Sequence, residues 1–196
     1  MSDGSLRLLV GLLWAAFVFL WLVLGLFNKK ASRSAPRWIN WGLRLAIIIG
    51  AFIIIRFNRH ATAALLVSLR RSLPANPGIA VQWLGVGFCV LGFGFAFWAR
   101  ACLGRNWGMP MSLRQGHELV TSGPYAYVRH PIYTGLMLAM IGSALVVSLL
   151  WMLLFPLYFA YFIFSARTEE KMMLAHFPDA YPAYRRRTKM LIPFVF

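Results

Sequence analysis

IYTGLMLAMIGSALVVSLLWMLLFPLYFAYFIFSA, residues 132–166, carries no charged side chain from end to end. As one helix, with a rise of about 1.5 Å per residue, it would be about 50 Å long, whereas the hydrocarbon core of a bilayer is about 30 Å thick. The segment is therefore too long for a single crossing. Two shorter helices folded as a hairpin fit the length, and Ser148 near the middle marks the expected turn.

The composition extends this interpretation to the whole chain. Of 196 residues, 60% are hydrophobic and 13% charged, whereas soluble domains are about 45–50% apolar and about 25% charged. Three further apolar segments are each long enough to span a bilayer, namely Leu8–Phe27, Trp38–Phe57 and Gly78–Ala99. The sequence predicts an all-α, polytopic integral membrane protein with about five transmembrane helices. Small residues allow helices to pack closely in lipid, which is the role expected of Gly85, Gly87, Gly92 and Gly94.

Charge sets the expected orientation. The net charge is +15, and most basic residues lie in Lys29–Arg44, in Arg100–Arg129 and in the tail from Arg167. These three segments fall on one side of a five-span topology, and basic loops stay in the cytoplasm. The N-terminus is therefore predicted outside and the C-terminus inside, and lipid rather than nucleic acid is the expected partner of the basic residues. Cys89 and Cys102 lack a metal-binding spacing, so neither a metal site nor a disulfide framework is expected.

A polar stretch, Gly116–Tyr133, separates the third span from the hairpin and holds two of the four histidines. Polar groups beside a bilayer usually serve a function. Pro131 suits the first turn of a helix, and the hairpin then returns the chain to the same interface at Glu169 and Glu170. We therefore expect one of these carboxylates to meet the corner that begins at His130. A carboxylate among aromatic rings would suit a flat, cationic cofactor.

Four motifs in this part of the chain, in this order, resemble those of the isoprenylcysteine carboxyl methyltransferases and of related membrane phospholipid methyltransferases. They are Leu103–Trp107, Gly116–Tyr125, Val128–Tyr133, and Glu169-Glu170 followed by Phe177 and Tyr181. The resemblance covers about residues 100–193. Together with the apolar spans it divides the chain into two parts, with three transmembrane helices and their connectors in residues 1–99 and an implied methyltransferase core in residues 100–196.

The resemblance also implies S-adenosylmethionine as the cofactor, a pocket closed by the C-terminal segment, and a lipid substrate that enters from the bilayer. The residues implied in cofactor binding are His117, Glu118, Leu119, Val120, Tyr125, His130, Pro131, Ile132, Tyr133 and Glu169. The candidate catalytic residues are Arg129, Glu169 and Glu170.

Two departures from the family pattern leave the methyl acceptor open. The family's carboxyl methyltransferases have a substrate-binding arginine four residues before the glutamate, where this chain has Ser165, and the nearest arginine, Arg167, becomes the candidate substrate residue. Pro178 replaces a glycine in the tail. A carboxylate acceptor needs no general base, whereas an amine must lose a proton. The favoured function is methylation of a prenylated or other lipophilic acceptor. The alternatives are a phospholipid N-methyltransferase, a sterol-type NADPH reductase and a non-catalytic membrane protein.

Overall fold

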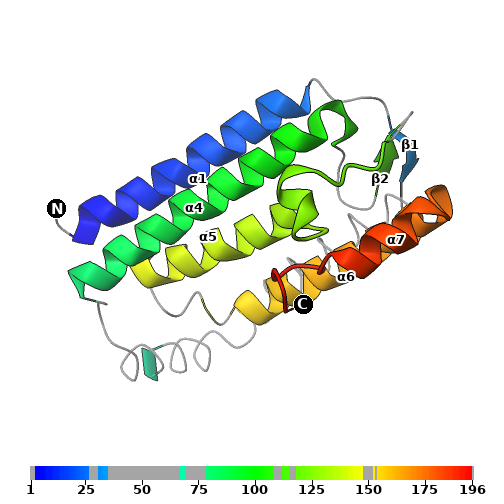
Figure 1. The fold of residues 1–196 in the computed structure, drawn as a ribbon. Coiled ribbons are helices and arrows are strands. Elements are labelled where there is room, and N and C mark those ends of the chain that lie inside the picture. The colour runs from blue at the N-terminus through cyan, green and yellow to red at the C-terminus, as the bar shows by residue number, and fades with distance from the viewer. Residues whose placement is uncertain are drawn as a thin grey trace, which may run out of the picture.

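Long helices run side by side in the computed structural model of the protein, and a short C-terminal helix packs at one end (Figure 1). The structure describes residues 3–26, 31–34, 67–68, 78–107, 112–114, 118–147, 152 and 154–195. The α-helices within them are α1 (Asp3–Gly25), α4 (Ile79–Leu103), α5 (Pro131–Val147), α6 (Phe155–His176) and α7 (Ala180–Arg187). Two 3-10 turns, η1 (Gly104–Asn106) and η2 (Gly123–Ala126), and two strands, β1 (Ala31–Ser34) and β2 (Ser112–Arg114), complete the elements.

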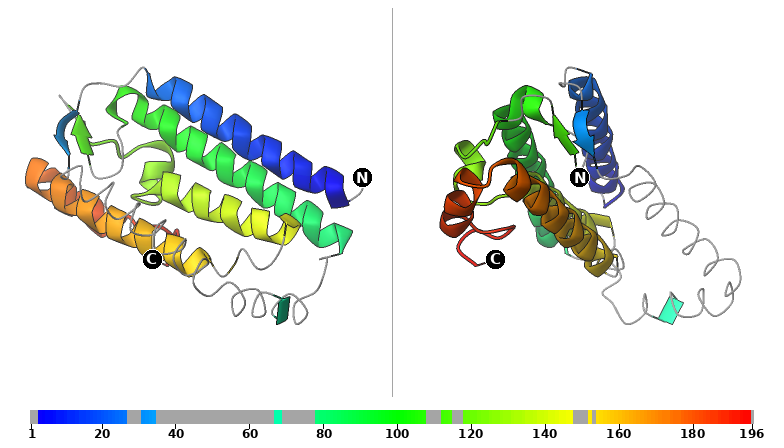
Figure 2. Two further views of the ribbon diagram at one scale, coloured as in Figure 1. Left: turned by 180° about the vertical axis from the view of Figure 1, so that it is seen from behind. Right: turned by 90° about the vertical axis from the view of Figure 1, so that its right-hand side faces the viewer.

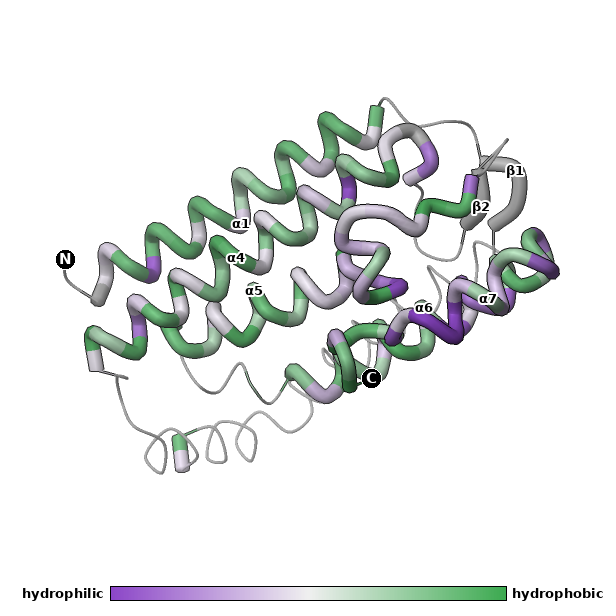
Figure 3. Tube along the Cα trace, viewed as in Figure 1, coloured by the Kyte–Doolittle hydropathy of each residue, from purple (hydrophilic) through white to green (hydrophobic). Residues whose placement is uncertain are grey.

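Helix α4 packs against both α1 and α5, α1 also contacts α5, and α6 lies beside α5 (Figure 2). Helix α7 turns back along the polar end of α6. Hydrophobic residues cover most of α1, α4 and α5, whereas the hydrophilic residues gather at the end of the bundle where α6 and α7 meet (Figure 3). Strands β1 and β2 form a small antiparallel ribbon near the same end.

Glycine brings α4 and α5 into close contact. A Cβ atom on Gly92 would lie 2.4 Å from the carbonyl oxygen of Gly135, and one on Gly85 would lie 2.7 Å from that of Gly142. No side chain fits at such a distance, so the two backbones touch, as expected for packing in lipid. An added Cβ on Gly87 or Gly94 would meet no atom of the described residues within 4 Å, so a packing role for these two glycines stays a prediction.

Helix α1 is attached to this pair by polar contacts and by an aromatic cluster. The indole nitrogen of Trp14 donates a 2.9 Å hydrogen bond to Ser143 Oγ on α5. The Trp14 ring also packs edge-on against Phe93 of α4, with ring centroids 4.9 Å apart. The Cys89 thiol is buried in the same core, which is the environment expected of a structural cysteine.

The helical class and the hairpin are confirmed, and the β1–β2 ribbon is an addition to the predicted all-α fold. Helices α1 and α4 are long and apolar enough to cross a membrane, while α5 is a shorter apolar helix. The expected span Trp38–Phe57 and the turn at Ser148 lie outside the described residues. Helix α6 continues well past Ala166 because the polar residues that follow it are good helix formers.

Candidate active site

The candidate site forms where α5 begins beside the polar half of α6. Ser165 and Glu169 lie four residues apart on α6, so they share one face of the helix. Both meet Tyr133 in the first turn of α5, whose hydroxyl donates a 2.5 Å hydrogen bond to Glu169 Oε1 and lies 3.3 Å from Ser165 Oγ. The hairpin therefore joins the two segments that the sequence predicts to meet.

His130 lies between the two glutamates. Its Nδ1 is 3.4 Å from Glu169 Oε2, and its Nε2 is 3.5 Å from Glu170 Oε1. The ring is buried and stacks on Tyr133, with centroids 5.6 Å apart. Burial alone would lower the pKa of His130, but its contacts with Glu169 and Glu170 raise that pKa above the ordinary value of 6.5. Nε2 has no well-aligned hydrogen-bond acceptor among the described residues.

Arg129 and Glu170 form a buried ion pair next to this cluster. Arg129 Nε donates to Glu170 Oε1 at 2.6 Å, and the two side chains are 8% and 5% exposed. Burial by itself would raise the pKa of Glu170, yet the close contact with His130 and the hydrogen bond from Arg129 bring it below its ordinary value. The guanidinium also donates to the carbonyl oxygens of Arg185 and Thr188. Arg129 thus links α6 to the C-terminal segment.

The C-terminal segment covers the site through backbone hydrogen bonds. The amides of Arg129 and His130 donate to the carbonyls of Lys189 and Met190 at 2.8 and 3.1 Å. The Thr134 hydroxyl on α5 donates to the carbonyl of Leu191 at 2.6 Å. These bonds make the tail a short strand-like partner of the segment before α5, and closure of a cofactor pocket by this tail stays a prediction.

Three buried tyrosines lie in η2 and α7, namely Tyr125, Tyr181 and Tyr184. Tyr184 donates a 2.7 Å hydrogen bond to the carbonyl of Tyr125. Burial, and secondly the negative charge of Glu169, raise the pKa of Tyr125 well above its ordinary value. Tyr125 therefore lies within electrostatic range of the carboxylate. Tyr181 is buried on the same face of α7 as Tyr184.

Some of the site residues predicted from the sequence lie in this cluster, and others lie outside it. Tyr125, Arg129, His130, Tyr133, Glu169 and Glu170 come together as described above. Pro131 is buried at the first position of α5, and Ile132 packs against the apolar cluster around Tyr133. Glu118 is exposed, whereas Leu119 and Val120 are half-buried.

Two predicted residues stand apart. Arg167 is exposed, and a position two residues from both Ser165 and Glu169 lies off their shared face of α6. His117 lies outside the described residues. Binding roles for Arg167, His117 and the neighbouring Glu118, Leu119 and Val120 stay predictions.

Several residues of the site were not expected from the sequence. Thr134 and Thr188 anchor the tail, and Arg185, expected to face lipid, lies 3.5 Å from Glu170. The spacing of Tyr181, Tyr184 and Thr188, which places all three on one helical face, is a signal that could have identified Thr188. Within the described part of the chain, no group of three or more His, Cys, Asp or Glu side chains is arranged to hold a metal ion.

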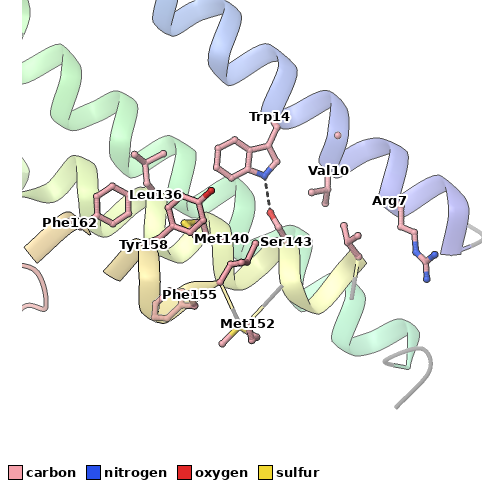
Figure 4. A pocket seen from close by; sticks show the side chains of 13 residues that line it. Arg7, Val10, Trp14, Leu136, Met140, Ser143, Met152, Phe155, Tyr158 and Phe162 are labelled. Carbon is pink, nitrogen blue, oxygen red and sulfur yellow. Dashed lines mark hydrogen bonds between the residues drawn. The ribbon is translucent and has the colours of Figure 1, made fainter. Parts of the chain in front are cut away.

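An apolar pocket of about 520 Å³ lies between α1, α5 and α6 (Figure 4). Its lining side chains include Trp14 of α1, Leu136 and Met140 of α5, and Phe155 and Phe162 of α6. The Phe162 ring stacks on Tyr133 with centroids 4.9 Å apart. One end of the pocket therefore adjoins the carboxylate cluster.

Comparison with known proteins supports the resemblance. A family model described as phospholipid methyltransferase matches residues 80–180. The protein-S-isoprenylcysteine O-methyltransferase of Schizosaccharomyces pombe is 40% identical over 82 residues, which cover 40% of this chain and 34% of that protein. The enzyme of the same name from Tribolium castaneum is 29% identical over 211 aligned positions, covering 92% of this chain and 74% of that protein.

Two further matches are a resistance protein and a solved structure. The cobalt-zinc-cadmium resistance protein CzcN of Cupriavidus metallidurans is 35% identical over 99 residues, covering 47% of this chain and 44% of that protein. A solved structure of the eukaryotic intramembrane Ras methyltransferase ICMT matches with a TM-score of 0.54 and 28% identity, over 71% of this chain and 53% of that one. The matches thus span less than half the length of the S. pombe and Cupriavidus relatives.

Proposed function

The chain belongs to the phospholipid methyltransferase family, and from this premise we propose that it is a membrane methyltransferase. It uses S-adenosylmethionine to methylate a lipophilic acceptor, and its activity is most like that of a protein-S-isoprenylcysteine O-methyltransferase. The observation that carries the proposal is the meeting of Tyr133, His130 and Glu169 at the start of the hairpin. We place the methyltransferase core in residues 100–196 and the three preceding membrane helices and their connectors in residues 1–99.

The residues present fit this cofactor, which carries a sulfonium and an ammonium group. Glu169 offers a carboxylate that is 26% exposed and oriented by Tyr133. Aromatic faces such as that of Tyr125 attract cations, and the buried His130 Nε2 has no aligned hydrogen-bond partner among the described residues. Glu169, His130, Tyr133 and Tyr125 would hold the cofactor, together with the main chain around residues 117–120 and with Pro131 and Ile132. When bound, the cofactor supplies an electrophilic methyl group together with its own leaving group.

The protein's own residues then act mainly by positioning and charge. Tyr133 and His130 fix the Glu169 carboxylate. Arg129 and Glu170 bind each other and the tail rather than an open space, so we assign them a positioning role. A carboxylate acceptor would need no base, whereas an amine acceptor would pass its proton to Glu169 or His130.

A phospholipid N-methyltransferase is the second candidate. It is favoured by the small, buried Ser165 beside Tyr133, at the position where the carboxyl methyltransferases have an arginine. The two candidates differ in the acceptor and share the cofactor.

A methyl-transfer assay separates them. Purified protein in lipid nanodiscs is given S-adenosylmethionine with a labelled methyl group, together with either S-prenylated cysteines or phosphatidylethanolamine. Label in the prenylcysteine ester supports the first candidate, and label in the phospholipid headgroup supports the second. Transfer to neither, in protein that also fails to bind S-adenosylhomocysteine, overturns the proposal.

We further propose that the site faces the cytoplasm, because the basic segments lie on its side of the membrane. Phe194 is 84% exposed in the tail. A cysteine at this position, in a Cys102→Ser background, should react with an impermeant maleimide only after the cells are opened. Labelling of intact cells would place the site outside.

A further inference from the structure

We propose that the apolar pocket between α1, α5 and α6 holds a single hydrocarbon chain of the methyl acceptor, and that Gly11 at its far end sets the length of chain accepted. The inference rests on the proposed methyltransferase function and assigns the acceptor to amphiphiles with one chain.

The pocket ends next to the candidate site. Leu136 and Phe162 line its inner end, and Phe162 stacks on Tyr133, which donates to Glu169. From Leu136 the lining continues along one face of α5 to Val147, a rise of about 16 Å along the helix. A chain lying along this face would place its polar head beside the carboxylates.

The size and chemistry of the pocket favour one chain. A volume of about 520 Å³ is typical of sites for drug-sized ligands. A lipid with two long tails is larger than a drug-sized ligand. Its lining is almost entirely apolar, and the polar atoms of Ser143 and Trp14 are already bonded to each other. An apolar chain therefore enters without leaving a buried polar group unpaired.

At the far end of the pocket, α1 has a glycine. The Trp14–Ser143 bond aligns α1 antiparallel to α5 (Figure 4), so Gly11, one turn before Trp14, is level with the end of α5. Gly11 lines the pocket, and a Cβ atom added to it would meet no atom of the described residues within 4 Å. Arg7, one turn further, brings a charge to this end. A larger side chain at residue 11 would therefore fill the end of the pocket without displacing protein atoms.

The test compares Gly11→Leu with Gly94→Leu. Gly94 also lies in an apolar helix with open space around an added Cβ, but it does not line the pocket. Each variant is assayed with S-geranyl, S-farnesyl and S-geranylgeranyl N-acetylcysteine. Gly11→Leu should lower kcat/KM for the longest chain about tenfold relative to the shortest, the loss expected when roughly two methylene groups are excluded from an apolar site. Gly94→Leu should leave this ratio unchanged.

A second readout is independent of catalysis. A farnesyl or geranylgeranyl cysteine with a terminal diazirine is photolysed in wild-type protein, and the labelled peptides are mapped by mass spectrometry. Label on residues 7–14 that is lost in Gly11→Leu supports the inference. Two results would overturn the inference while the proposed function stands. One is equal labelling of α4 residues that do not line the pocket. The other is methyl transfer in Gly11→Leu with an unchanged ratio of kcat/KM between the longest and shortest chains. Absence of both cofactor binding and transfer overturns the proposed function, and the photolabel still decides whether the pocket binds a chain.

Discussion

Glu169 and Glu170 are neighbours in sequence, and their replacement by alanine should have different effects. Glu170→Ala removes the partner of a 2.6 Å ion pair whose two side chains are 8% and 5% exposed. Loss of one partner leaves a buried charge, which typically costs about 3–5 kcal/mol of stability. Glu169→Ala removes the hydrogen bond from Tyr133 at a side chain that is 26% exposed, and about 1 kcal/mol is expected.

The loss of cofactor affinity in the two variants should follow the opposite order to their loss of stability. Glu169 is the more open carboxylate, and its loss should weaken binding of S-adenosylhomocysteine more than tenfold, which corresponds to about 1.4 kcal/mol or more. Glu170→Ala should weaken binding less in the fraction that stays folded, because this carboxylate faces Arg129.

The assays are thermal denaturation in detergent, followed by tryptophan fluorescence, and equilibrium binding of S-adenosylhomocysteine. The double variant Arg129→Met/Glu170→Leu serves as the control, because removing both charges avoids the unpaired guanidinium and should recover part of the lost stability. If Glu169→Ala is the more destabilising variant and Glu170→Ala the weaker binder, the two assignments must be exchanged.

Three further predictions concern pH, helix packing and the tail. The pKa of His130 is raised from 6.5 and that of Glu170 lowered from 4.5, so His130 stabilises the fold below pH 6.5 and Glu170 above pH 4.5. Thermal stability should therefore peak between these values, and His130→Asn should remove the decline on the alkaline side; a decline that persists in this variant would contradict the assignment. Gly92→Val, whose Cβ would meet a backbone oxygen at 2.4 Å, should cost about 1–3 kcal/mol or more in detergent denaturation, whereas equal loss in Gly94→Val would refute the close-packing account. Tyr184→Phe removes a 2.7 Å hydrogen bond, so it should cost about 1 kcal/mol and speed limited proteolysis of the tail, and a tail cut no faster than in the wild type would contradict its anchoring role.

The hairpin was predictable because its segment lacks charge and exceeds the bilayer thickness. The packing face of α4 was not. Gly85 and Gly92 lie seven residues apart, as do Gly87 and Gly94, so spacing alone does not tell which pair faces α5. The structure selects the first pair, because only these glycines oppose Gly135 and Gly142.

The site was predictable in its principal residues and not in its closure. The hairpin returns the chain to the start of α5, where Glu169 accepts a hydrogen bond from Tyr133. Ser165 lies on the same helix face as Glu169 and meets the same hydroxyl. The pairing of the segment around Val128 with Lys189 joins two irregular segments, and no periodic pattern in the sequence indicates it. Arg185 looked like one of several topogenic cations, and only the fold places it beside Glu170.

The most direct test of the proposed function is calorimetric titration of S-adenosylhomocysteine into detergent-solubilised protein, with NADPH titrated in parallel. A saturable heat for S-adenosylhomocysteine with none for NADPH is the predicted result. No heat for S-adenosylhomocysteine from protein shown to be folded, or a saturable heat for NADPH instead, would contradict it.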